Sequence, residues 1–101
     1  MYDSITEITF DNESYSYLIL SNENNNLIMN LNTEELIELD ENIQYIVDPY
    51  EYKNDKKIIN SDKYLITVNN NKYGVIDYNG NTILDLKYDY IRIIRRLYEN
   101  K

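Results

Sequence analysis

The stretch from residue 63 to residue 94 constrains the fold most, because short apolar runs alternate there with turn residues. The three apolar runs are Tyr64–Val68, Lys72–Asp77 and Thr82–Leu86. Asn69–Asn71 separates the first two, and Tyr78–Asn81, which contains Asn-Gly, separates the last two. Asn-Gly between apolar runs is a strong β-hairpin signal, because both turn residues must tolerate positive φ. We therefore predict antiparallel strands joined by tight turns.

The same stretch resembles one unit of the WG-repeat family, whose units often begin Lys-Trp-Gly and continue with two apolar residues, Asp and, three positions later, Gly. The run from Lys72 to Gly80 is KYGVIDYNG, with Tyr73 at the place of the usual Trp. Ile83-Leu84 and Tyr88-Asp89-Tyr90-Ile91 complete the match. The resemblance implies a fold built from β repeats that serves as an interaction surface. It implies little about the target.

A weaker second copy of this unit occupies residues 17–39. A shift of 47 positions places Tyr17-Leu18-Ile19 on Tyr64-Leu65-Ile66, and the alignment needs no gap as far as residue 39. The first copy is degenerate, because Asn26-Leu27 stands where the second copy has Tyr73-Gly74. Internal repetition of this length indicates stacked or paired repeats.

We therefore predict an all-β fold of two related antiparallel β-meanders that share one core. The expected organisation is a single domain, residues 1–101, with repeat 1 at about 2–47, a connector at about 48–62 and repeat 2 at about 63–101. In the first repeat we expect strands near residues 5–10, 15–21 and 27–31, and a strand or short helical piece at 36–39.

Two further segments are harder to assign. Pro49 cannot donate to a strand ladder, so we expect a break there, followed by a loop with one short strand over residues 50–63. In residues 91–101 the apolar spacing suits a strand poorly and one helical face better. We expect a strand to about Ile94 and then a short helical or frayed end.

The composition excludes several classes of function. The 101 residues include no Cys and no His, and the only glycines are Gly74 and Gly80. The chain thus lacks thiolate chemistry, the commonest general base and a phosphate-binding glycine-rich loop. No signal peptide or apolar span is evident, which favours a cytoplasmic protein of a bacterium or phage-infected host. We expect a protein that is not an enzyme and uses no metal or cofactor, since no pair among its carboxylates is marked for hydrolysis or calcium binding.

Charge is divided unevenly along the chain, whose formal net charge is −8. Residues 1–52 contain twelve acidic side chains and no Lys or Arg, whereas residues 53–101 contain ten basic and six acidic side chains. The acidic half is either a solvated face, partly neutralised by the basic half, or a surface that docks on a basic partner. The net charge disfavours nucleic acid as a ligand, because the long-range field repels phosphate. The basic cluster Lys87, Arg92, Arg95 and Arg96 is therefore expected to pair with an acidic half, within one chain or head-to-tail in an oligomer.

The predicted partner-binding residues combine carboxylates with tyrosines near Pro49, because tyrosine is enriched at interface hot spots. They are Glu34, Glu35, Glu38, Asp40, Glu41, Tyr45, Asp48, Tyr50, Glu51 and Tyr52, and the three tyrosines are expected to be exposed. Small acidic proteins without catalytic residues are often inhibitors, such as anti-CRISPR proteins, other phage counter-defence factors or immunity proteins. The leading hypothesis is an inhibitor that docks on the nucleic-acid-handling surface of a CRISPR effector or nuclease. The alternative is a WG-repeat structural or scaffolding module that self-assembles.

Overall fold

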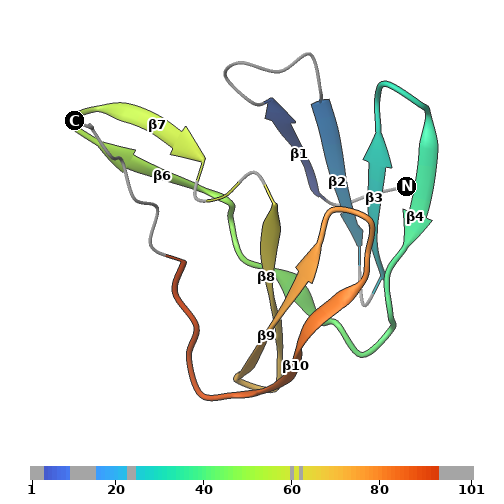
Figure 1. Ribbon diagram of the computed structural model, residues 1–101, viewed down its shortest axis with the longest axis vertical. Helices are drawn as coiled ribbons and strands as arrows, with labels where there is room; N and C mark the ends of the chain where they lie inside the picture. Colours follow the sequence, from blue (N-terminus) through green and yellow to red (C-terminus); the bar gives the residue numbers. More distant parts are fainter. Residues whose placement is uncertain (1–3, 10–15, 23–24, 60, 62, 94–101) are drawn as a thin grey trace.

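The computed structural model describes residues 4–9, 16–22, 25–59, 61 and 63–93. Within these residues the chain forms ten β-strands and no helix, arranged as antiparallel sheets (Figure 1). The predicted all-β class with antiparallel meanders is therefore confirmed. Figure 1 shows one four-stranded sheet at the upper right, a second below it and a two-stranded hairpin at the upper left.

The first sheet, called sheet A, is a simple up-and-down meander. Its order is β1-β2-β3-β4, so each strand pairs with the one that follows it in the chain. Its strands are β1 (Ser4–Thr9), β2 (Ser16–Asn22), β3 (Asn25–Asn30) and β4 (Glu35–Glu38). The segment 36–39, left open between strand and helix, is thus an edge strand.

The second sheet, called sheet B, has the order β10-β9-β8-β5. Its strands are β5 (Tyr45–Ile46), β8 (Tyr64–Asn69), β9 (Lys72–Asp77) and β10 (Thr82–Tyr88). The connector between the repeats holds a separate hairpin, β6 (Tyr50–Lys53) and β7 (Lys56–Ile59). The predicted loop with one short strand is wrong here. Asn54 and Asp55 both have positive φ, of 52° and 65°, and this is the backbone that a two-residue hairpin turn requires.

The central hairpins of the two sheets have the same register. In sheet A, Leu20 pairs with Leu27, and in sheet B, Thr67 pairs with Gly74. Each pair from Tyr17↔Asn30 to Asn22↔Asn25 recurs 47 positions later. The similarity of the two copies in sequence is therefore also a similarity in strand pairing.

The turns of sheet B follow two different designs. Asn70 and Asn71 have φ of 51° and 68° and close β8–β9 directly. At Asn79-Gly80 only Gly80 has positive φ, of 87°, so the expectation of two such residues is wrong there. Instead the Asp77 carboxylate accepts hydrogen bonds from the backbone amides of Asn79 at 2.9 Å and Asn81 at 2.8 Å, which holds a wider turn.

The chain leaves the sheet earlier than expected. β10 ends at Tyr88, and residues 89–93 have no regular secondary structure, so the predicted strand to Ile94 is wrong. The segment turns back over sheet B instead, where the Tyr90 ring lies 5.3 Å from the ring of Tyr73 and Asp89 pairs with Lys72. These contacts replace strand pairing. The predicted helical end lies outside the described residues.

One core joins the two sheets, as predicted. Its buried side chains come from sheet A, the loop after β4, β7 and sheet B: Ile8, Ile19, Ile28, Leu39, Ile43, Ile59, Leu65, Ile76 and Tyr78. Tyr17 of sheet A and Tyr78, just after β9, contact each other with ring centroids 4.8 Å apart.

The two sheets contribute non-equivalent faces to this core. Sheet A turns Ile19 and Ile28 inward, whereas sheet B turns Leu65 and Ile76 inward. The counterparts of Leu65 and Ile76 in sheet A are Leu18 and Met29, on its opposite side. The repeats therefore pack front to back. The face of sheet A that matches the packed face of sheet B points away from the core.

Candidate functional site

The predicted partner-binding residues lie in three separate places. Glu34, Glu35 and Glu38 lie on the turn before β4 and on β4 itself, and all three are exposed. Asp40 and Glu41 are exposed in the loop that leads from sheet A toward sheet B. The other five residues belong to β5, to the break near Pro49 and to β6. The structure does not bring the ten together into one patch.

The tyrosines of this set differ in exposure. Tyr45 is 48% exposed and Tyr52 is 72% exposed. Tyr50, predicted to be exposed, is half-buried against the core, because its hydroxyl reaches the Glu7 carbonyl at 3.4 Å and Lys57 lies over its ring at 4.5 Å. Tyr50 therefore fastens the β6–β7 hairpin to sheet A.

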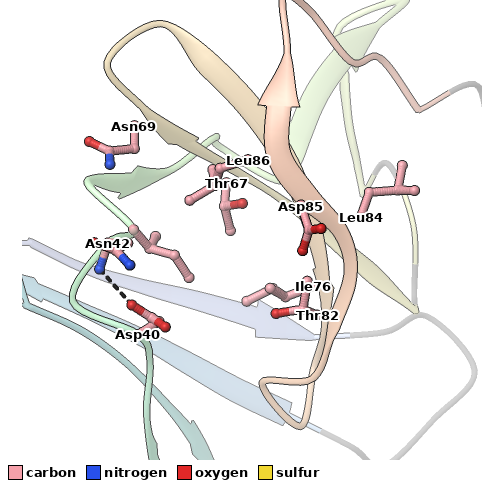
Figure 2. Close-up of a pocket in the computed structure, with 10 residues that line it drawn as sticks. Asp40, Asn42, Thr67, Asn69, Ile76, Thr82, Leu84, Asp85 and Leu86 are labelled. Carbon is pink, nitrogen blue, oxygen red and sulfur yellow. Dashed lines mark hydrogen bonds between the residues drawn. The ribbon is translucent and has the colours of Figure 1, made fainter.

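A cavity of about 350 Å³ lies between the loop after β4 and the inner face of sheet B (Figure 2). We call it the sheet B cavity. It is lined by Asp40, Asn42, Ile43, Thr67, Asn69, Ile76, Thr82, Leu84, Asp85 and Leu86. Only Asp40 among them was predicted from the sequence as a site residue.

Polar groups from three elements meet in the sheet B cavity. Figure 2 shows three side chains on three sides of the cavity: Asp40, Asp85 of β10 and Thr67 of β8. Both carboxylates are exposed, whereas Thr67 is only 1% exposed. Asp40 Oδ1 accepts a hydrogen bond from the backbone amide of Asn42 at 2.7 Å, and this bond orients the Asp40 carboxylate. No hydrogen bond to the hydroxyl of Thr67 is found among the described residues.

A second cavity, of about 380 Å³, lies on the opposite side of sheet B, where the segment after β10 crosses it. Three of the predicted partner-binding residues line it: Asp48, Tyr50 and Glu51. Their neighbours in the cavity were not predicted to lie beside them. These neighbours include Tyr73, Tyr90 and Arg92. Asp48 Oδ1 accepts from the Tyr50 amide at 3.0 Å, so its carboxylate shapes the chain break at Pro49.

The described carboxylates of the acidic half form no ion pair with a Lys or Arg of the chain. Between residues 4 and 52 the structure describes eight acidic side chains, none of which forms an ion pair. In the described part of the chain the one ion pair joins Lys72 and Asp89 at 2.6 Å, and both belong to the second half. The hypothesis that the basic half neutralises the acidic half thus gains no support from direct ion pairing in this region.

Two carboxyl groups among the described residues, Asp77 and Asp89, have shifted pKa values, and hydrogen bonds or a neighbouring charge cause both shifts. Burial alone raises the pKa of Asp77, but hydrogen bonds from Asn81, Asn79 and Gly80 outweigh it and leave the pKa below the ordinary 3.8. The hydrogen bond and charge of Lys72 lower the pKa of Asp89. Neither shift creates a group that titrates near neutral pH.

The described residues contain no cluster of three or more His, Cys, Asp or Glu side chains that could hold a metal ion. Over the same residues there is no helix that is both long and apolar enough to cross a membrane. Of the basic cluster, Lys87 and Arg92 are exposed, while Arg95 and Arg96 lie outside the described residues.

The sequence analysis did not identify several residues that shape these sites. Asn26 is 2% exposed and ties sheet A to the loop after β4 through its side chain. Thr67 and Asp85 looked like ordinary strand residues. The 47-residue shift offered one signal, because it sets Asn26 against Tyr73 and Thr67 against Leu20. Where one copy has a polar residue and the other copy has an apolar residue at the equivalent position, the polar residue is expected to serve a purpose specific to its own copy.

No protein-family model matches the chain, and no curated protein or solved structure shows significant similarity to it. The resemblance to WG repeats therefore stays a prediction carried by the residues from Lys72 to Ile91.

Proposed function

We propose that this protein is a non-enzymatic inhibitor that binds another protein, docking its acidic half on a basic surface built to handle nucleic acid. The observation that carries the proposal is the absence of ion pairs at the eight described carboxylates of residues 4–52. A surface that tracks phosphates uses Lys and Arg side chains. Carboxylates held on a sheet can occupy such a surface and exclude nucleic acid.

The placement of the carboxylates supports rapid, steered association. Glu34, Glu35 and Glu38 are exposed around an edge strand, and Asp40 and Glu41 follow in the next loop. Complementary potentials of this kind raise association rates and select partners more than they add affinity. A protein partner is favoured over nucleic acid, since the net charge of −8 repels phosphate.

A CRISPR effector or a nuclease is the proposed target class, with phage counter-defence or immunity to a toxin as the biological role. This part of the proposal rests on small size and acidity. The direct test measures cleavage by a panel of purified nucleases and CRISPR effectors with increasing amounts of the full chain. We expect stoichiometric inhibition of one target, with an association rate that falls steeply as salt increases. A rate that does not change with ionic strength would remove the steering argument.

A specific observation favours a second candidate, a scaffolding module that self-assembles. The outer face of sheet A combines aliphatic side chains with two carboxylates, and its members are Ile5, Glu7, Leu18, Leu20, Leu27, Met29, Leu36 and Glu38. Ile5 is 62% exposed and Leu36 is 54% exposed. This face is the counterpart of the face by which sheet B packs on sheet A, so a further sheet could stack on it.

Sedimentation of the full chain separates the two candidates. Self-assembly through the outer face predicts a concentration-dependent oligomer that Leu36→Gln dissociates. Ile83→Gln is the matched control, because Ile83 occupies the equivalent position of β10 and is 47% exposed. A monomer at all concentrations, with or without these substitutions, favours the inhibitor.

A further inference from the structure

We propose that the sheet B cavity binds the head of an alkylammonium or alkylguanidinium group. The group comes either from a Lys or Arg side chain of a partner protein or from a free aliphatic amine. The first source extends the proposed function and rests on it, whereas the second stands without it. The inference starts from three polar groups, Asp40, Asp85 and Thr67, that face one cavity from three different elements (Figure 2).

The acceptors of this cavity suit a cation. Asp40 Oδ1 accepts a hydrogen bond from the backbone amide of Asn42 at 2.7 Å. Within the described residues the Asp40 carboxylate accepts no other hydrogen bond. The carboxylate of Asp85 likewise accepts no hydrogen bond from the described part of the chain. An ammonium group carries three donors and no acceptor, and a guanidinium carries five donors. Charge-assisted hydrogen bonds to carboxylates are the stronger kind.

Thr67 is the independent sign that something polar belongs in the cavity. Its side chain is 1% exposed and lines the cavity, yet its hydroxyl has no partner among the described residues. Buried polar groups in folded proteins are almost always hydrogen-bonded. A donor held in the cavity by Asp40 and Asp85 can supply the missing partner, because Thr67 lines the same cavity as these two carboxylates (Figure 2).

The apolar residues that line the cavity indicate what the uncharged part of the ligand is. Ile43, Ile76 and Leu86 line the cavity and offer an aliphatic surface to a short alkyl stem. No aromatic ring lines it, so the usual platform for a sugar is missing from this part of the structure. For a metal ion, the described residues offer no group of three or more His, Cys, Asp or Glu side chains, at this cavity or elsewhere. The volume of about 350 Å³ is at the small end of ligand sites, which span about 300–1,000 Å³.

The test is a titration of the full chain with n-butylammonium chloride, followed by the backbone amide signals in NMR spectra. We expect saturable shifts concentrated at residues 40–43, 67–69 and 82–86. The double variant Asp40→Asn/Asp85→Asn should weaken binding about tenfold or more, since it removes both charged acceptors. Thr67→Val keeps the shape of the side chain, removes the hydroxyl and should weaken binding about threefold.

Two controls match these variants. Glu35→Gln/Glu38→Gln makes the same change in net charge at exposed positions outside the cavity and should leave binding within about twofold, because screened surface charges contribute little. n-Butanol has the same stem without the charge and should not produce the shifts. Equal weakening by both double variants, or equal binding of butanol, would overturn the proposal.

A second ligand identifies the source of the cation. N-Acetyl-lysine N′-methylamide presents the same ammonium on a peptide backbone. Shifts with both ligands assign the site to a partner's side chain, and shifts with butylammonium alone assign it to a free amine. If neither binds while inhibition of a nuclease remains salt-dependent, the cavity proposal fails and the proposed function stands. If the amine binds and no nuclease is inhibited, the proposed function fails and the cavity site stands.

Discussion

The side-chain amide of Asn26 donates a hydrogen bond to the backbone carbonyl of Ile43 at 3.0 Å. Asn26 lies on β3 of sheet A and Ile43 precedes β5 of sheet B, so the bond ties sheet A to the loop that leads to sheet B. Asn26 Oδ1 accepts from the Ser21 hydroxyl at 2.7 Å, and its backbone carbonyl accepts from the Leu39 amide at 2.9 Å. This buried side chain therefore sets the path of the loop that carries Asp40 into the sheet B cavity.

Replacing Asn26 by Ala should destabilise the fold strongly. The change leaves the Ile43 carbonyl and the Ser21 hydroxyl without these partners, and a buried unsatisfied polar group costs about 1–3 kcal/mol. We expect a loss of about 2 kcal/mol and a Tm lower by about 10 °C. Urea unfolding and thermal melts measure both. Asn25→Ala, at the exposed neighbouring position, is the control and should change Tm little, so equal losses in the two variants would contradict the role of Asn26.

Gly74→Ala should disrupt the pairing of β9 with β10. A Cβ at this position would lie 2.7 Å from the backbone carbonyl oxygen of Leu84, and backbone cannot move aside as a side-chain tip can. Overpacking of this kind costs about 1–3 kcal/mol. Urea unfolding should show that loss, and amide exchange should accelerate in β10 first. Thr82→Ala, on an exposed position of β10, serves as the control. Unchanged stability of the Gly74 variant would mean that β10 does not approach β9 this closely.

Acid should weaken the fold partly through Asp77. Burial works to raise the pKa of this carboxyl, but the hydrogen bonds from Asn81, Asn79 and Gly80 lower it below 3.8 overall. A carboxyl whose folded pKa is depressed stabilises the fold above its unfolded pKa, and that contribution is lost as the pH falls through the folded pKa. Stability should therefore decline below about pH 4.

Asp77→Asn tests the assignment, because it keeps a side-chain oxygen that can accept from the turn amides and removes the titration. The free energy of unfolding, measured in urea between pH 2 and pH 6, should fall less steeply with acid in this variant. The measurements use about 0.5 M salt to screen the exposed Lys72–Asp89 pair, whose carboxyl also has a lowered pKa. Asp85→Asn removes a carboxylate from an exposed site and is the matched control. If the free energy of unfolding falls equally with acid in the wild type and in Asp77→Asn, Asp77 does not contribute to the acid sensitivity.

Salt should stabilise the isolated chain. The described carboxylates of residues 4–52 lack ion pairs, so their mutual repulsion acts on the folded state. Repulsion between exposed charges is largely screened beyond a Debye length, which is about 10 Å at 0.1 M salt and shortens as salt increases. We expect Tm to rise by several degrees from low to high salt, and to rise less in the triple variant Glu34→Gln/Glu35→Gln/Glu38→Gln. The control neutralises Lys56, Lys57 and Lys63 with Gln and should increase the salt dependence. A Tm that falls with salt would show that attractive pairs dominate.

Much of the architecture was predictable, because alternation of apolar residues and turn chemistry act locally. The 47-residue shift anticipated the register shared by the β2–β3 and β8–β9 hairpins. The connector hairpin was missed although Asn54-Asp55 is a good turn sequence, since charged residues around it suggested a loop. The tail was mispredicted because Tyr90 packs on Tyr73, a contact between distant residues that no local pattern contains.

The candidate site was predictable only in its chemistry. Residue types alone fixed that carboxylates would crowd the first half and that thiols and imidazoles would be unavailable, because charge and reactivity belong to each side chain wherever it lies. Tertiary structure alone decided that Asp40 meets Asp85 and Thr67 around one cavity, and that the two repeats pack front to back. Those outcomes depend on which face of each sheet is buried, and two copies with the same pairing can bury opposite faces. The alternation of residues along a strand determines which side chains share a face of the sheet. Which of the two faces is buried in the core is determined only by the packing of the sheets against each other.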